Sequence, residues 1–147
     1  MEIKYSQKNA TENEIFTHLE ECDAEFFPPL SERIEPEKYA HKIFDKALTF
    51  EAWHENILVG LVAVYINNSA NPPSAFITNV SVIKKYYGSG IASELLGNCI
   101  AYVKKEHISE IKLEVNIKSI SAISFYKKYD FIKDGEKNGF LMMKLNQ

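Results

Sequence analysis

The chain has 147 residues, close to the roughly 150 typical of one domain, so residues 1–147 are expected to form a single domain. Hydrophobic residues make up 46% and charged residues 25%, which argues against intrinsic disorder. The longest apolar run, residues 57–66, is half of the roughly twenty residues that a membrane span needs. The net charge of −3 provides no basic footprint for nucleic acid. The first residues have no basic start or apolar core, so no signal peptide and a cytoplasmic location are expected.

The two cysteines and the charge distribution narrow the function classes further. Cys22 and Cys99 lie far apart without a CxxC or His/Cys cluster, so we expect reduced thiols and no metal. Residues 1–83 carry 6 Lys+Arg against 13 Asp+Glu, a net of −7, and residues 84–147 carry 11 against 7, a net of +4. Such a division would suit two ligands of opposite charge, and it would equally suit two ordinary solvated surfaces.

The first part of the chain predicts one strand and two helices. Residues 3–6 are typical of a short opening strand. The capping-box pattern from Thr11 to Glu14 predicts the start of a helix, and the prolines within residues 26–30 prevent its continuation. Pro36 suits the first turn of a second helix, whose apolar spacing continues to Ala47.

Hydrophobic periodicity and turn residues predict the remaining elements. They are strands at 48–53, 57–66 and 75–82, a helix at 88–105, a strand at 111–117, a helix at 119–129, and a closing hairpin of 131–133 with 140–145. Strands joined by hairpins pair antiparallel, whereas a strand-helix-strand crossover makes a parallel pair. The sequence therefore predicts an α/β (α+β) fold with a mixed, mostly antiparallel central sheet and helices on both faces.

The segment that points to chemistry joins the strand at 75–82 to the long helix. It contains Gly88-Ser89-Gly90, and glycines permit positive φ angles and close approach of a ligand to the backbone. The helix that follows offers free N–H groups and the positive end of its dipole, which together favour a phosphate site. A P-loop lysine is absent, and Ser93 stands where a dinucleotide fingerprint needs its third glycine. A plain turn before a helix, or another nucleotide site, remains an alternative at this point.

This segment resembles the GNAT superfamily of acetyl-CoA-dependent N-acetyltransferases, whose loop ends in Gly-x-Gly/Ala between a strand and a helix. A second block is also similar: residues 113–115 and 119–131 match the family's Leu-Glu-Val strand and Asn-x-x-Ala-x-x-Phe-Tyr-x-x-x-Gly-Phe helix. Three positions depart from the family pattern: Tyr87 replaces the usual Arg or Gln of the loop, Ser119 the family's Asn and Asp130 its Gly. Ser119 could still cap the helix, and Asp130 could end it in left-handed geometry.

The resemblance implies a role for each matching residue. The pyrophosphate of acetyl-CoA would be bound by backbone N–H groups of Gly88, Ser89, Gly90, Ile91, Ala92 and Ser93. The acetyl-pantetheine arm would lie along the main chain of Val80, Ser81 and Val82, with Ser119 nearby. Tyr126 would protonate the departing thiolate, unless it is a core aromatic. Glu114 would be the general base for the amine, unless it is only a surface carboxylate.

The implied function is transfer of an acetyl group from acetyl-CoA, without a metal, to a primary amine by direct attack in a ternary complex. A group of acidic residues surrounds the aromatic stretch 26–30 and suggests a cationic amine on a small molecule or a peptide or protein N-terminus: Glu20, Glu21, Asp23, Glu25, Glu32, Glu35 and Glu37. The alternatives are a catalytically inactive CoA-binding sensor or partner module and a nucleotide-binding protein. Family members are often dimers, so a homodimer is one expected state; no nucleic acid or membrane partner is expected.

Overall fold

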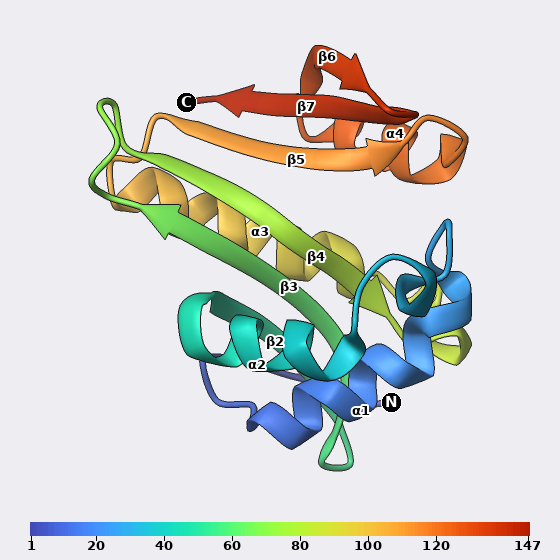
Figure 1. The fold of residues 1–147 in the computed structure, drawn as a ribbon. Coiled ribbons are helices and arrows are strands. Elements are labelled where there is room, and N and C mark those ends of the chain that lie inside the picture. Colours follow the sequence, from blue (N-terminus) through green and yellow to red (C-terminus); the bar gives the residue numbers. More distant parts are fainter.

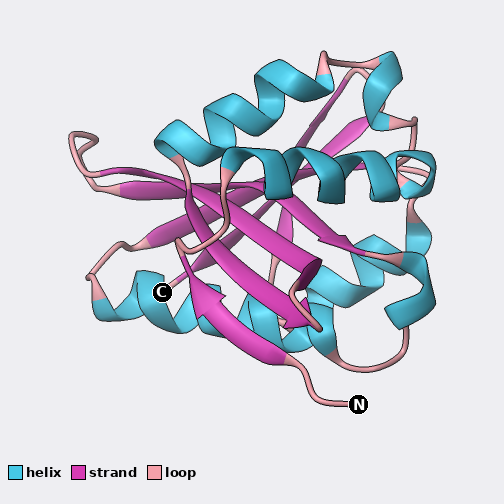
Figure 2. Ribbon diagram, turned by 90° about the horizontal axis from the view of Figure 1, so that it is seen from below, coloured by secondary structure: helices cyan, strands magenta, loops and turns pink.

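The computed structural model describes residues 1–147, which form one seven-stranded sheet of order β1-β2-β3-β4-β5-β7-β6 between two layers of helices (Figures 1 and 2). The strands are β1 Lys4–Gln7, β2 Leu48–His54, β3 Ile57–Asn67, β4 Ser74–Val82, β5 Glu110–Asn116, β6 Ile132–Lys137 and β7 Phe140–Asn146. The helices are α1 Glu12–Cys22, α2 Pro36–Lys46, α3 Ile91–Lys105 and α4 Ile120–Lys128, with short 3₁₀ turns at Asp23–Glu25, Leu30–Glu32 and Lys84–Tyr86. Only β4 and β5 pair parallel, which confirms the mixed, mostly antiparallel sheet.

Each face of the sheet has its own hydrophobic core. On one face, α3 and α4 cover a core that includes Phe50, Leu96, Ile111, Phe131 and Met143. On the other face, α1 and α2 cover a smaller core that includes Ile15, Leu19, Ile43 and Leu61. These two layers of helices are visible above and below the strands in Figure 2. None of the helices combines the length and the apolar character that crossing a bilayer requires.

Local sequence chemistry accounts for the helix starts. The capping box at α1 is complete, because the Glu14 N–H donates to Thr11 Oγ1 at 3.1 Å and the Thr11 N–H donates to Glu14 Oε1 at 2.9 Å. Pro36 lies in the first turn of α2, where its missing N–H costs nothing. The prediction that a helix begins at Gly88 is wrong: α3 begins at Ile91, because Gly88 and Gly90 have φ angles of +80° and +81°.

Strand β4 changes course at Thr78. Val64 of β3 lies opposite Ile77, whereas Ala63 lies opposite Asn79, so Thr78 is an extra residue in a β-bulge. The bulge changes which face the following side chains take: Val80 packs on the α3 side of the sheet, with Ile77. Asn79 turns toward α1.

Close contact between β3 and α3 depends on Gly60. A Cβ atom built on Gly60 would lie 2.7 Å from Ile91 Cγ2 and 3.0 Å from Leu95 Cδ1, closer than packed side chains allow. We therefore expect Gly60→Val to lower the free energy of unfolding by about 1–3 kcal/mol, measured by urea denaturation. Gly97→Ala is the matched control, because its Cβ would meet nothing within 4 Å and alanine favours a helix interior. Equal stability of Gly60→Val and the wild type would show that α3 is free to move away from the sheet.

Candidate functional site

The glycine loop before α3 has the geometry of an anion site. Gly88 and Gly90 both have left-handed φ angles, and a Cβ on either glycine would meet nothing within 4 Å. Gly90 is the N-cap of α3 and supplies no side-chain cap, and the Glu94 N–H makes the bond to its carbonyl that begins the helix. The N–H groups of residues 91–93 therefore have no partner inside the helix and are available to a ligand.

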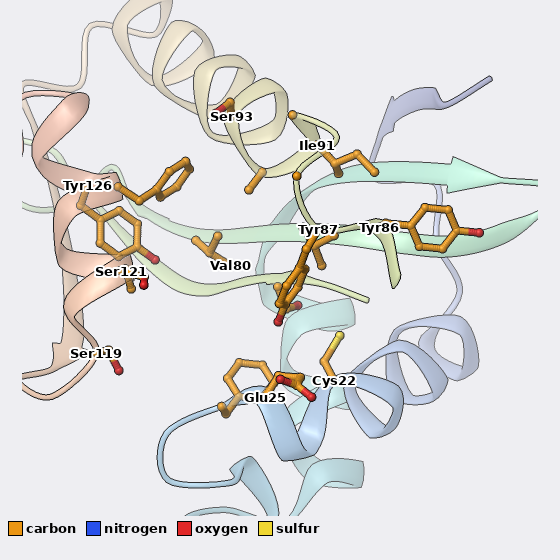
Figure 3. A pocket seen from close by; sticks show the side chains of 18 of the residues that line it. Cys22, Glu25, Val80, Tyr86, Tyr87, Ile91, Ser93, Ser119, Ser121 and Tyr126 are labelled. Atoms are coloured by element: carbon orange, nitrogen blue, oxygen red, sulfur yellow. The ribbon is translucent and has the colours of Figure 1, made fainter. Parts of the chain in front are cut away.

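A cleft of about 810 Å³ lies in front of this loop, bounded by β4, α3 and α4 (Figure 3). The predicted site residues that line it are Val80, Ser81, Val82, Gly88, Gly90, Ile91, Ala92, Ser93, Ser119 and Tyr126. Ser89 does not line it, because its hydroxyl donates to the Tyr86 carbonyl oxygen within the loop. Ser119 is the N-cap residue of α4, but its hydroxyl makes no capping bond and stays available to the cleft. Asp130, with a φ of +70°, confirms the left-handed geometry expected after α4.

Backbone groups of β4 face the opening between β4 and β5. The two strands pair only from Ser74–Glu110 to Ile77–Leu113 and then separate, as Figure 1 shows. The Ile83 N–H donates to the Val59 carbonyl at 2.9 Å, which sets the alternation of N–H directions along β4. By that alternation, the N–H groups of Val80 and Val82 point away from β3 and toward the opening.

Tyr126 stands at the opposite wall of the cleft. Its ring packs edge-on against Phe125 and Phe131, with ring centroids 5.5 Å and 5.9 Å away, and only 8% of the residue is exposed. Burial raises the pKa of its hydroxyl, and no hydrogen bond or nearby charge offsets that effect. The phenol therefore stays protonated at neutral pH, and Figure 3 shows it reaching from α4 into the cavity.

A second cavity of about 330 Å³ adjoins the cleft. Six residues line both spaces: Glu25, Phe26, Val80, Ser119, Ala122 and Tyr126. Glu114 lines only the second cavity, where its exposed side chain projects from β5. The structure thus places the two predicted proton carriers, Tyr126 and Glu114, around one small space next to the opening between β4 and β5.

A buried polar chain holds β4 against α1. His18 Nδ1 lies 2.9 Å from the Leu58 carbonyl oxygen, which only accepts, so Nδ1 carries the proton and Nε2 accepts from Ser81 Oγ at 2.8 Å. Asn79 Nδ2 donates in turn to Ser81 Oγ at 2.8 Å. Burial lowers the pKa of His18 to about 4, so the imidazole is neutral at pH 7. The Ser81 hydroxyl is therefore occupied within the protein, and by the alternation along β4 its backbone N–H points to β3.

Several lining residues could not be recognised from the sequence, since they come from segments far apart in the chain. Cys22, Tyr86 and Lys118 line the cleft, and Arg33, Ile34, Tyr39, Phe76 and Phe140 line the second cavity. Burial raises the pKa of the Cys22 thiol to about 12, which keeps it protonated. No local motif marks these positions.

The acidic residues around stretch 26–30 do not gather at the site. Of the seven, only Glu25 lines either cavity. Asp23 accepts hydrogen bonds from the Ser31 N–H at 2.7 Å and the Ser31 hydroxyl at 2.8 Å. Glu35 forms an exposed ion pair with Lys38 at 3.1 Å. Most of the acidic side chains that suggested a cationic acceptor therefore lie outside the two cavities.

Known proteins agree with this architecture. Among the relatives are the N-alpha-acetyltransferase MAK3 of Arabidopsis thaliana, 30% identical over 86 residues (58% of this chain, 45% of that protein), and streptothricin acetyltransferase A of Bacillus subtilis, 28% identical over 125 residues (84% and 69%). This chain thus spans less than half of the length of MAK3. The PaiA N-acetyltransferase of Thermoplasma acidophilum, solved in complex with coenzyme A, shares the fold with a TM-score of 0.79 at 19% identity, over 100% of both chains.

The sequence pattern of one family extends over most of the chain. The profile described as "Acetyltransferase (GNAT) family" matches residues 13–131, which include all of α1 except its first residue, the glycine loop and α4. That range also contains Val80, Glu114 and Tyr126, the residues around the opening between β4 and β5. The chain belongs to the acetyltransferase (GNAT) family.

Proposed function

We propose that this protein transfers the acetyl group of acetyl-CoA to a primary amine by direct attack in a ternary complex. The observation that carries the proposal is the separation of β4 from β5 after Ile77, with a cleft on one side and a second cavity on the other. The two spaces meet at Val80 and Tyr126. Relatives named for peptide N-terminal and for streptothricin acetylation support an amine on a peptide or protein N-terminus or on a small molecule.

The cleft fits acetyl-CoA in its chemistry. The free N–H groups at Gly88 to Ser93 suit the pyrophosphate, since a helix N-terminus preceded by glycines lets phosphate oxygens reach the backbone. The main chain of Val80 and Val82 suits the amide groups of the pantetheine arm, because β5 no longer pairs with it. The Ser119 hydroxyl, free of any capping bond, would be a further partner for that arm.

The residues around the opening would divide the chemistry between them. Holding the amine beside the thioester supplies proximity, and the C–N bond forms as the C–S bond breaks. The Val80 N–H would stabilise the negative charge that develops on the carbonyl oxygen. Glu114 would accept the amine's proton, directly or through water, and Tyr126 would donate its phenolic proton to the leaving thiolate.

Amine-dependent release of free thiol tests this function directly. The protein is incubated with acetyl-CoA and each of spermidine, D-glucosamine, L-leucine and a tetrapeptide with a free N-terminus. We expect at least one amine to accelerate thiol release and to gain 42 Da, the mass of an added acetyl group less a proton, about one acetyl per molecule by mass spectrometry. Tight binding of acetyl-CoA without turnover of any amine would instead favour the non-catalytic CoA-binding module.

Acetyl-CoA affinity should depend on Gly90. Valine at this position would strain the φ of +81° and project a branched side chain into the space in front of the loop. We expect Gly90→Val to weaken acetyl-CoA binding at least tenfold, which corresponds to about 1.4 kcal/mol, measured by titration calorimetry. Gly139→Val is the matched control, because Gly139 has the same φ of +81° but lines neither cavity. Unchanged affinity in a folded Gly90→Val variant would remove this loop from the site.

A further inference from the structure

Arg33 is the only arginine of the 147-residue chain, and it lines the second cavity. Its guanidinium carbon lies 4.4 Å from the centre of the Phe140 ring, a cation–π arrangement that orients the planar group. The chain has 20 Asp and Glu residues, yet none forms an ion pair with Arg33. An oriented guanidinium without a carboxylate partner therefore faces a cavity that the rest of the site leaves open.

The sheet register places Arg33 near Glu114. Phe140 lies opposite Asn116, and Glu114 lies opposite Met142, so Phe140 and Glu114 are diagonal neighbours on one face of the β5–β7 pair. Diagonal neighbours are separated by about 7–8 Å. The positive group held on Phe140 and the carboxylate of Glu114 thus share one wall of the cavity without neutralising each other.

The cavity therefore offers one carboxylate, that of Glu114, and one cation, between largely apolar walls. The walls include Phe26, Leu30 and Phe76, which keep part of the space away from water. Arg33 is an exposed residue, so shape carries the recognition: the guanidinium fork matches the geometry of carboxylate and phosphate oxygens. An amine without an anionic group would offer this guanidinium no partner of opposite charge.

We propose that Arg33 binds an anionic group, a carboxylate or a phosphate, on the same molecule that carries the acceptor amine. The amine would lie toward Glu114, and the anionic group would lie on the guanidinium above Phe140. This inference rests on the proposed acetyl transfer and narrows its acceptor to amines that also carry a negative charge, such as amino acids or phosphorylated amino sugars.

Two matched pairs of probes test the proposal. L-Leucine is compared with 3-methylbutylamine, which lacks only the carboxylate, and D-glucosamine 6-phosphate is compared with D-glucosamine. Binding to the CoA-loaded protein is measured by calorimetry, and turnover with acetyl-CoA is measured as thiol release. In at least one pair, we expect the anionic member to bind at least tenfold more tightly. Arg33→Gln should remove this preference. It should change the affinity for the pair member that lacks the carboxylate or phosphate less than twofold.

Two further variants separate recognition from general charge. Lys38→Gln removes a positive charge from α2 at a position that lines neither cavity, and it should keep the preference. Arg33→Lys keeps the positive charge without the planar fork, so this variant should retain only part of the preference for the anionic group. A preference in the leucine pair alone identifies a carboxylate, and one in the glucosamine pair alone identifies a phosphate.

The outcomes distinguish this inference from the proposed function. Preferential binding that depends on Arg33, without any thiol release, would support the anion site and overturn acetyl transfer. Turnover of 3-methylbutylamine and D-glucosamine, with no preference for their carboxylate- or phosphate-bearing partners, would support acetyl transfer and overturn the anion site. The anion site would also be overturned if none of the four probes bound. The same holds if Arg33→Gln lowered the affinity equally for both members of a pair.

Discussion

Replacing Tyr126 by phenylalanine is expected to lower kcat by about 10²–10⁴-fold, the usual contribution of a positioned acid. The hydroxyl faces the junction of the two cavities, and its raised pKa keeps the proton on the oxygen until a thiolate forms. Phenylalanine keeps the ring that packs against Phe125 and Phe131, so the affinity for acetyl-CoA should change less than twofold. Pre-steady-state kinetics measure the chemical step and calorimetry measures the affinity.

Tyr65→Phe is the control for loss of a buried phenol. The Tyr65 hydroxyl is buried without a hydrogen-bond partner, but Tyr65 lines neither cavity. Its removal should leave kcat and the free energy of unfolding close to those of the wild type. If Tyr126→Phe also retains nearly full kcat while chemistry limits the rate, Tyr126 is a core aromatic and the thiolate leaves without its help.

Glu114→Gln should lower kcat/KM by about 10²–10⁴-fold at neutral pH, the range for a positioned base. The effect should be greatest at low pH, where the amine arrives protonated and needs a group to remove its proton. At high pH the free amine attacks without a base, so the variant should regain part of its activity. Its pH profile should therefore follow the fraction of free amine in solution, whereas the wild-type profile should be flatter below the pKa of the amine.

Glu110→Gln provides the comparison on the same strand. Glu110 lies near Lys112 at 3.6 Å and lines neither cavity, so its replacement should not move the pH profile. A Glu114→Gln profile that superposes on the wild type would show that another group or bulk water accepts the proton. Glu114 would then be an exposed carboxylate of β5 with no part in the reaction.

Features that depend on neighbours in the chain could be predicted from the sequence. The capping box at Thr11, the first-turn Pro36 and the left-handed Asp130 follow from backbone chemistry within a few residues. The glycine loop belongs to the same class, because Gly88 and Gly90 adopt positive φ at no steric cost and precede a strongly amphipathic helix. The order of strands and helices was also predicted, since each carries its own hydrophobic period.

What the tertiary structure decided is which of these pieces meet. The bulge at Thr78 turns Asn79 and Ser81 toward α1, and no composition rule predicts the register shift that creates it. The same holds for the stacking of Arg33 on Phe140, which joins residues more than a hundred positions apart, and for the dispersal of the acidic side chains around stretch 26–30. The spacing of apolar residues in the sequence determines which face of each single helix or strand is buried. Which of these faces enclose a cavity is determined by the separation of β4 from β5. That separation could not be predicted from the sequence, because it depends on how all layers of the fold pack together.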